Sequence, residues 1–208
     1  MEACFVYWDN SNIFHEAQRL AEDREATPLA RNRVRINFDT LYRLAHADRP
    51  VEKAHVAGSI PPPLSNLWTR LENQGLNVTL FDRKRTGHGE QGVPDQILQL
   101  RMLEDAVDYN GDPGVVVLLS GDGSGYREGA GFHSTLERMH GRGWRVEVLS
   151  WEHSCKQRMR GWAESNGLFV PLDDFYESIT FVEESEPGYT FVAHRPGAQL
   201  DLAQRSTL

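Results

Sequence analysis

The run Val115-Val116-Val117-Leu118-Leu119, with Ser120-Gly121-Asp122 directly after it, decides the fold. A short continuous apolar run that ends in turn residues predicts a strand buried on both faces, which is typical of the centre of a parallel sheet. Residues 4–8 form a second apolar run, and Asp9 follows it. The sequence therefore predicts two buried strands, each with an aspartate at or just beyond its carboxyl end.

Helix and strand patterns alternate on both sides of these two runs. Apolar residues at helical spacing predict helices after Asn10-Ser11, from Asp95 onward, and at residues 39–47, 136–140 and 155–164. Shorter runs predict strands at residues 51–58, 76–81, 146–149 and 168–170. Pro61-Pro62-Pro63 is typical of the start of a further helix, which ends at Gly75. Because this alternation continues to about residue 172, we expect an open α/β sheet with right-handed crossovers.

The pattern weakens after Tyr176. Residues 179–182 and 189–192 are apolar enough to pair as a hairpin, whereas residues 196–208 are typical of a frayed tail. We therefore expect one domain over residues 1–178 and a C-terminal extension over residues 179–208, with a hairpin and then a flexible tail.

The composition indicates a soluble globular protein. Apolar residues make up 39% of the 208 residues, and no stretch approaches the roughly 18 consecutive apolar residues of a membrane helix. The two cysteines supply neither a disulfide framework nor a zinc pattern, which favours a reducing compartment. The first residues lack the pattern of a signal peptide. We therefore expect a cytoplasmic protein with no membrane partner, and the sequence is compatible with a homo-oligomer.

Three aspartates fall at corresponding places of the predicted sheet. Asp9 ends the first strand, Asp122 follows the strand at residues 115–119, and Asp95 begins the helix after the loop that leaves residues 76–81. The carboxyl ends of parallel strands meet at one edge, where three carboxylates would raise each other's pKa unless a cation neutralised them. A hard divalent ion such as Mg²⁺, which prefers carboxylates, waters and phosphate, is the natural cation for such a site.

Each aspartate also has an ordinary structural interpretation. Asp9 is a suitable helix cap, Asp122 a turn residue, and Asp95 an acid favoured in the first turn of a helix. The glycines within residues 121–125 follow the pattern G-x-G-x-G, which is not the dinucleotide fingerprint, and Asp122 would repel a pyrophosphate. Coincidence of the three acids at one edge favours a shared metal site over nucleotide-cofactor binding.

Any nucleic-acid ligand must overcome a net charge of −8, so local cations matter. Arg83-Lys84-Arg85 lies in the loop that leads to Asp95 and could track a nucleic-acid backbone, although many such runs are only solvated loops. A second stripe is predicted where arginines alternate in a strand-like stretch, at Arg31, Arg33 and Arg35. The cations Lys156, Arg158 and Arg160 are interpreted as an exposed helix face, and His153 as an ordinary surface group.

Tryptophans are more often core residues than platforms for bases. Trp68 and Trp144 are interpreted as core. Trp151 lies between Ser150 and Glu152 after a predicted strand end, and we predict that it is the tryptophan that meets a base.

Four segments in order resemble the NYN domain, a branch of the PIN-like nucleases. They are Asp9-Asn10-Ser11-Asn12, Gly92-Val93-Pro94-Asp95, residues 116–122 and residues 143–148. The resemblance covers roughly residues 3–175. It implies a Rossmann-like (PIN-like), three-layer α/β fold with helices on both faces of a mainly parallel sheet, and an acidic pocket that binds Mg²⁺ or Mn²⁺ for RNA cleavage. Matched residue by residue, it implies that Asp9, Asp95 and Asp122 are the metal ligands and that Asn12 is the asparagine that accompanies the first acid.

The sequence also departs from the family pattern. Ser124 stands where many relatives have a second acid, and Arg101 stands where many have an acid within the helix that starts at Asp95. Gln91 or Gly92 occupies the place of a common lysine. This reduced set of acids puts two-ion chemistry in doubt.

The primary hypothesis is a metal-dependent ribonuclease that hydrolyses RNA phosphodiester bonds. Asp122 would accept the proton of the attacking water, Asn12 would position a carboxylate or donate to the phosphate, and Ser124 would hydrogen-bond the phosphate. The alternative is a catalytically weakened NYN module that binds RNA or a protein partner without cleavage. A phosphatase acting through the same acidic pocket ranks third.

Overall fold

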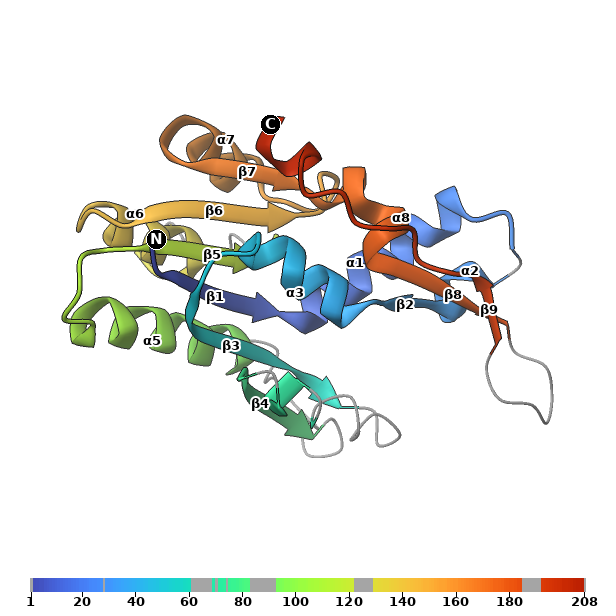
Figure 1. Cartoon of the computed structure of the whole chain (residues 1–208), viewed down its shortest axis with the longest axis horizontal. Coiled ribbons are helices and arrows are strands. Elements are labelled where there is room, and N and C mark those ends of the chain that lie inside the picture. Colours follow the sequence, from blue (N-terminus) through green and yellow to red (C-terminus); the bar gives the residue numbers. More distant parts are fainter. Residues whose placement is uncertain are drawn as a thin grey trace.

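A six-stranded parallel sheet lies at the centre of the molecule (Figure 1). The structure is a computed structural model that describes residues 2–27, 29–60, 69, 71–73, 75–82, 93–121, 129–184 and 192–207. The strands, in their order across the sheet, are β4 (Asn77–Asp82), β3 (Val51–Ile60), β1 (Cys4–Asp9), β5 (Val115–Leu119), β6 (Arg145–Ser150) and β7 (Leu168–Pro171). The predicted Rossmann-like α/β fold is confirmed.

Strands β1 and β5 form the middle of the sheet, and every residue of both is buried. They pair in parallel register, with Trp8 opposite Leu119. From β1 the chain builds outward through β3 to β4, then returns to β5 on the other side of β1 and continues to β6 and β7. The order of the strands therefore reverses between β1 and β5. In open α/β sheets, ligand sites form beyond the carboxyl ends of the strands at this switch point.

Helices cover both faces of the sheet. Alternate β1 residues point to opposite faces, with Val6 and Trp8 in one apolar core and Phe5 and Tyr7 in the other. The first core is covered by α1 (Asn10–Arg24) and α3 (Phe38–His46), and the second by α5 (Val93–Asp108), α6 (Gly131–His140) and α7 (Gln157–Asn166). Three layers result, as predicted. The helix predicted to open at Pro61-Pro62-Pro63 lies mostly outside the described residues.

A small second sheet lies beside the first, at the right of Figure 1. Its strands are β2 (Val34–Ile36), β8 (Thr180–Glu184) and β9 (Val192–Arg195), all antiparallel. β8 and β9 pair as predicted for a hairpin, but β9 begins at Val192, the last residue of the predicted range 189–192, whose first three residues lie outside the described residues. Strand β2 adds a third strand. Short helices connect the two sheets: α2 (Ala30–Arg33), η4 (Leu172–Phe175) and α8 (Tyr176–Ile179).

The predicted arginine stripe at Arg31, Arg33 and Arg35 is wrong. Arg31 and Arg33 lie in the helix α2, and only Arg35 lies in a strand. Arg31 pairs with Glu22 and Arg35 with Glu183, so these two cations neutralise carboxylates of the chain itself.

The C-terminal segment returns across the molecule to the six-stranded sheet and ends in η5 (Gln204–Thr207), near β7 (Figure 1). Leu200 and Leu202 pack against the first core, and Arg205 is only 7% exposed. The prediction of a frayed tail is therefore wrong for this segment. An isolated polar tail has no reason to order, but the tertiary fold supplies a buried carboxylate as partner for Arg205.

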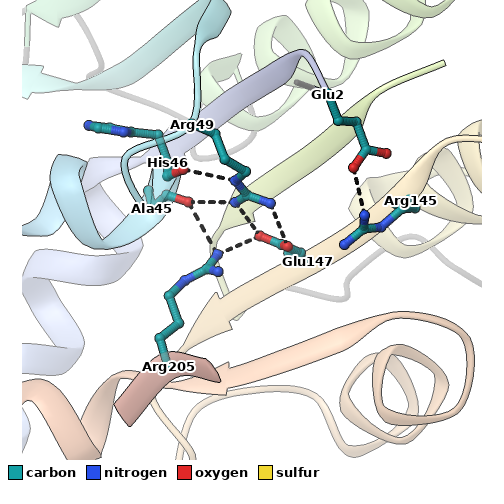
Figure 2. Close-up of polar contacts among 7 residues, drawn as sticks. All are labelled: Glu2, Ala45, His46, Arg49, Arg145, Glu147 and Arg205. Atoms are coloured by element: carbon teal, nitrogen blue, oxygen red, sulfur yellow. Dashed lines mark hydrogen bonds and ion pairs between the residues drawn. The ribbon is translucent and has the colours of Figure 1, made fainter. Parts of the chain in front are cut away.

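That carboxylate is Glu147, on β6 (Figure 2). Arg49 holds it through two hydrogen bonds, each of 2.7 Å, and Arg205 donates to the same carboxylate and to the carbonyl oxygen of Ala45. Burial by itself would raise the pKa of Glu147, but the hydrogen bonds from Arg49 and the charge of Arg205 outweigh it and hold the pKa below its usual value. A buried ion pair therefore holds the C-terminal segment against β6.

Replacing Arg205 with alanine is expected to lower the free energy of unfolding by about 1–3 kcal/mol, because a buried carboxylate loses one of its two cations. Since the pKa of Glu147 is lowered on folding, this contribution is present above the ordinary value of 4.5 and is lost as the pH falls. Urea unfolding near neutral pH and at about pH 3 should show the difference from wild type shrinking in acid.

Arg145 offers a matched control. It pairs with Glu2 at 2.6 Å, also in Figure 2, but its side chain is 66% exposed. Arg145→Ala should change the free energy of unfolding by no more than about 0.5 kcal/mol. If both variants lost the same free energy of unfolding, the buried Arg205–Glu147 pair would not be what holds the C-terminal segment in place.

A second buried carboxylate, Asp105, joins α5 to the sheet. It accepts hydrogen bonds from Tyr7 Oη on β1 at 2.7 Å and from Lys53 Nζ on β3 at 2.6 Å, and it lies 3.1 Å from His55 Nε2. Burial by itself would raise the pKa of Asp105, but these hydrogen bonds lower it to about 2. The network holds α5 in position against β1 and β3, and with it the first turn that carries Asp95.

Asp105→Asn is expected to lower the free energy of unfolding at neutral pH by about 2 kcal/mol, because the folded protein holds the carboxylate charged well below its ordinary pKa. The contribution is present above about pH 4 and falls away toward about pH 2, so the variant should show a flatter acid dependence. Thermal or urea unfolding of both proteins across this pH range measures the difference in their free energies of unfolding. Asp108→Asn, one turn later on the exposed side of α5, should behave as wild type.

Candidate active site

Asp9 lies at the carboxyl end of β1, at the switch point of the sheet, and is 3% exposed. Its Oδ1 accepts a hydrogen bond of 3.0 Å from the backbone N–H of Asn12, which makes Asp9 the N-cap of α1. Its Oδ2 accepts a hydrogen bond of 3.1 Å from the Ser120 hydroxyl, just beyond β5. Capping and the Ser120 contact together fix the orientation of the carboxylate at the junction of two strands.

Asn12 connects the first turn of α1 to the exit of β5. Its side-chain Oδ1 accepts a hydrogen bond of 2.9 Å from the backbone N–H of Gly121. The carbonyl oxygen of Gly121 in turn accepts a hydrogen bond of 3.1 Å from the backbone N–H of Lys156. The backbone is therefore held on both sides immediately before Asp122.

Gly121 lies in close packing at this point. A Cβ atom there would lie 2.7 Å from Ser150 Oγ and 3.2 Å from the backbone of Cys155. The exits of β5 and β6 therefore approach each other more closely than a larger residue would allow.

Asp95 lies in the first turn of α5 and is partly exposed. Helix α5 follows β4 and precedes β5, so it runs back along the sheet and begins at the edge where the strands end. Asp9 and Asp95 therefore lie at the same edge. Asp122 lies outside the described residues, and within the described part of the chain no group of three or more His, Cys, Asp or Glu is placed to hold a metal ion. Convergence of the three aspartates stays a prediction.

The other predicted ligand-binding residues divide into two groups. Ser124 and the basic run Arg83-Lys84-Arg85 lie outside the described residues. Trp151 is described, and the prediction that it meets a base is wrong. Its ring is 0% exposed, and its Nε1 donates to the carbonyl oxygen of Ile13 at 2.9 Å. The residue after β6 lies under α1, so this indole fills the core and has no face for stacking. Trp144 is core, as predicted, and Trp68 lies outside the described residues.

A polar pocket of about 240 Å³ includes Asn12 and Gly121, which lie next to Asp9 and Ser120 in this hydrogen-bond network. One wall is a face of α1, where three residues recur at helical spacing, and the other is the connection between β6 and α7. The lining residues are Asn12, Glu16, Arg19, Gly121, His153, Ser154 and Lys156. The spacing of residues 12, 16 and 19 could have indicated the first wall, but nothing in the sequence pattern brings His153 and Lys156 to it.

Glu16 organises the inside of this pocket. Its carboxylate accepts hydrogen bonds of 2.8 Å and 3.2 Å from Arg19 Nη1 and lies 3.0 Å from His153 Nε2. Glu16 is itself buried. It therefore fixes one basic side chain from α1 and one from the β6–α7 connection beside Asn12.

The described part of the site thus places Asp9 at the switch point of a Rossmann-like parallel sheet. The NYN domain family matches residues 4–162 of this chain, which therefore belongs to that family. Members of the family are generally ribonucleases and are associated with RNA substrates, and PIN-like nucleases typically use divalent metal ions.

The fold is also similar to that of a solved structure. It is the crystal structure of a protein of unknown function from Vibrio parahaemolyticus, with a TM-score of 0.58 and 21% sequence identity over 83% of this chain and 94% of that one. At this identity the likeness concerns the fold alone. No curated protein matches the sequence. None of the helices that the structure describes has the length and apolar character that a membrane span requires.

Asp9→Ala is expected to lower the free energy of unfolding by about 1–2 kcal/mol, because α1 loses its N-cap and Ser120 loses its acceptor. Asp9→Asn keeps an acceptor of the same shape and should cost only a few tenths of a kcal/mol. Urea unfolding of both variants measures the difference. Equal destabilisation by the two would show that the negative charge, rather than the cap, stabilises this end of α1.

Proposed function

We propose that this protein is a metal-dependent ribonuclease that hydrolyses RNA phosphodiester bonds through Asp9, Asp95 and Asp122. The observation that supports it most is the set of hydrogen bonds that orients Asp9 at the switch point and holds Gly121 immediately before Asp122, in a member of the NYN family. We further propose that residues 1–178 form the NYN domain, that residues 179–208 are an extension of it, and that the protein acts in the cytoplasm.

The donors at this edge fit a hard divalent cation. Asp9 and Asp95 offer carboxylate oxygens, and Asp122 would add a third carboxylate, which is the ligand type that Mg²⁺ and Mn²⁺ prefer. When bound, such an ion would lower the pKa of a coordinated water and offset the charge that develops on the phosphate.

The chain's own residues would position the reactants. Ser120 and the backbone of Asn12 hold the Asp9 carboxylate in one orientation. Because the Asn12 amide oxygen accepts from Gly121, its NH₂ group points the other way and can donate to a substrate phosphate without adding negative charge. Asp122 would accept the proton of the attacking water, and Ser124 would hydrogen-bond the phosphate. Arg83-Lys84-Arg85 would contact the RNA backbone.

The structure of α5 favours a second candidate function, a weakened NYN module that binds RNA or a protein partner without cutting. Arg101 stands where relatives carry an acid, and it pairs with Glu104 at 2.7 Å on the exposed surface of α5. This position therefore supplies no carboxylate to the edge of the sheet. The ribonuclease proposal consequently depends on the three aspartates alone.

Purified protein incubated with mixed RNA should cleave it in Mn²⁺ or Mg²⁺ and not in EDTA. Asp9→Asn and Asp95→Asn should each lower the rate by more than about 100-fold, because each removes a charged ligand of the ion. Asp108→Asn, at the opposite end of the same helix as Asp95, should cleave at the wild-type rate. Gel analysis of labelled RNA measures all four proteins.

Other outcomes separate the alternatives. Retention of RNA without cleavage would contradict the ribonuclease and support the binding module. Release of inorganic phosphate from small phosphate esters, with RNA left intact, would instead indicate a phosphatase. Cleavage that survives Asp9→Asn would show that the nuclease activity does not reside at this edge.

A further inference from the structure

We infer that the pocket between α1 and the β6–α7 connection is a subsite for a phosphate group of the RNA strand, next to the phosphate that is cut. This inference rests on the proposed function for its substrate. The pocket shares Asn12 with the candidate active site, and it also includes Gly121, which leads into Asp122. A group bound in the pocket would therefore contact Asn12, whose backbone N–H donates to the Asp9 carboxylate.

The charge of the pocket favours an anion. Within the described lining of the pocket, Arg19 and Lys156 contribute two positive charges against the single negative charge of Glu16, and His153 adds a further polar ring. Among the residues that the structure describes, no carboxylate forms an ion pair with Lys156. The chain as a whole carries a net charge of −8 and repels anions. A pocket whose described residues carry more positive than negative charge can still attract one locally.

Arg19 keeps donors for a ligand although it contacts Glu16. Both of its hydrogen bonds to Glu16 come from Nη1, and a guanidinium carries five N–H donors. Its side chain is 62% exposed, so Nη2 and Nε are accessible. The hydrogen bonds from Arg19 to Glu16 thus orient the Arg19 guanidinium. A guanidinium can donate to two oxygens of one phosphate at the same time.

The size of the pocket limits what it can hold. At about 240 Å³ it is smaller than the roughly 300–1,000 Å³ of pockets that enclose a whole small-molecule ligand. Its described lining is mostly polar, which disfavours an apolar group. A phosphate with part of its sugar fits these limits, and it can come from inside the strand or from a phosphorylated end.

Binding without cleavage tests the subsite independently of the nuclease proposal. Labelled oligoribonucleotides of mixed sequence, with a 5′-phosphate or a 5′-hydroxyl, are titrated with protein in EDTA. Arg19→Ala and Lys156→Ala should each weaken binding about 10-fold, since each removes a hydrogen bond from a charged donor, and should lower the log–log salt slope by about 1. A loss seen with both RNAs identifies an internal phosphate, and a loss confined to the 5′-phosphorylated RNA identifies a terminal one.

Arg158→Ala is the matched control, because it removes the same charge two residues from Lys156 on an exposed part of α7. It should change RNA affinity by less than about twofold. Losses no larger than that in Arg19→Ala and Lys156→Ala, or no RNA binding by the wild-type protein, would overturn the inference. Failure of the nuclease proposal gives a different result, in which RNA is bound through Arg19 and Lys156 but is not cut.

Discussion

The hydrogen bond from the Gly121 backbone to the Asn12 side chain connects the two halves of the sheet at the point where their strand order reverses. On one side of it, Asp9 caps α1 and accepts from Ser120; on the other, Lys156 holds the Gly121 carbonyl oxygen. A glycine at position 121 suits this close packing, because a Cβ atom there would displace Ser150 Oγ and press against the backbone of Cys155. The candidate active site and the neighbouring polar pocket both depend on this junction.

Buried carboxylates hold the rest of the frame in place, and each is neutralised from a distant part of the chain. Glu147 binds Arg49 and Arg205, and Asp105 binds Lys53. In an acidic protein these pairs occupy cations that would otherwise be free to attract RNA. The cations of the polar pocket, Lys156 and the exposed Arg19, which keeps further donors beyond its bonds to Glu16, therefore matter more for a nucleic-acid ligand than the total number of basic residues suggests.

Each error of sequence interpretation has a physical origin. Trp151 follows a strand end and was expected to be accessible. Helix α1 covers that end, and the indole N–H donates to the carbonyl oxygen of Ile13. Residues 196–208 are polar and were expected to fray, but β6 presents Glu147 to Arg205. Arg31, Arg33 and Arg35 alternate like a strand, but the first two lie in a helical turn. In the first two cases a contact between segments far apart in the sequence outweighs the local pattern, and in the third a helical turn replaces the expected strand.

The sequence by itself determined the alternation of strands and helices, the two buried central strands, and the place of Asp9 and Asp95 at strand or helix ends, because apolar periodicity and chain order dictate these features. Only the tertiary structure decided which polar residues meet across the edge. Glu16 and His153 are 137 positions apart, and they come together because parallel crossovers bring α1 and the β6–α7 connection to the same end of the sheet. Contacts of this kind depend on the packing of whole layers, which no local pattern of residues encodes.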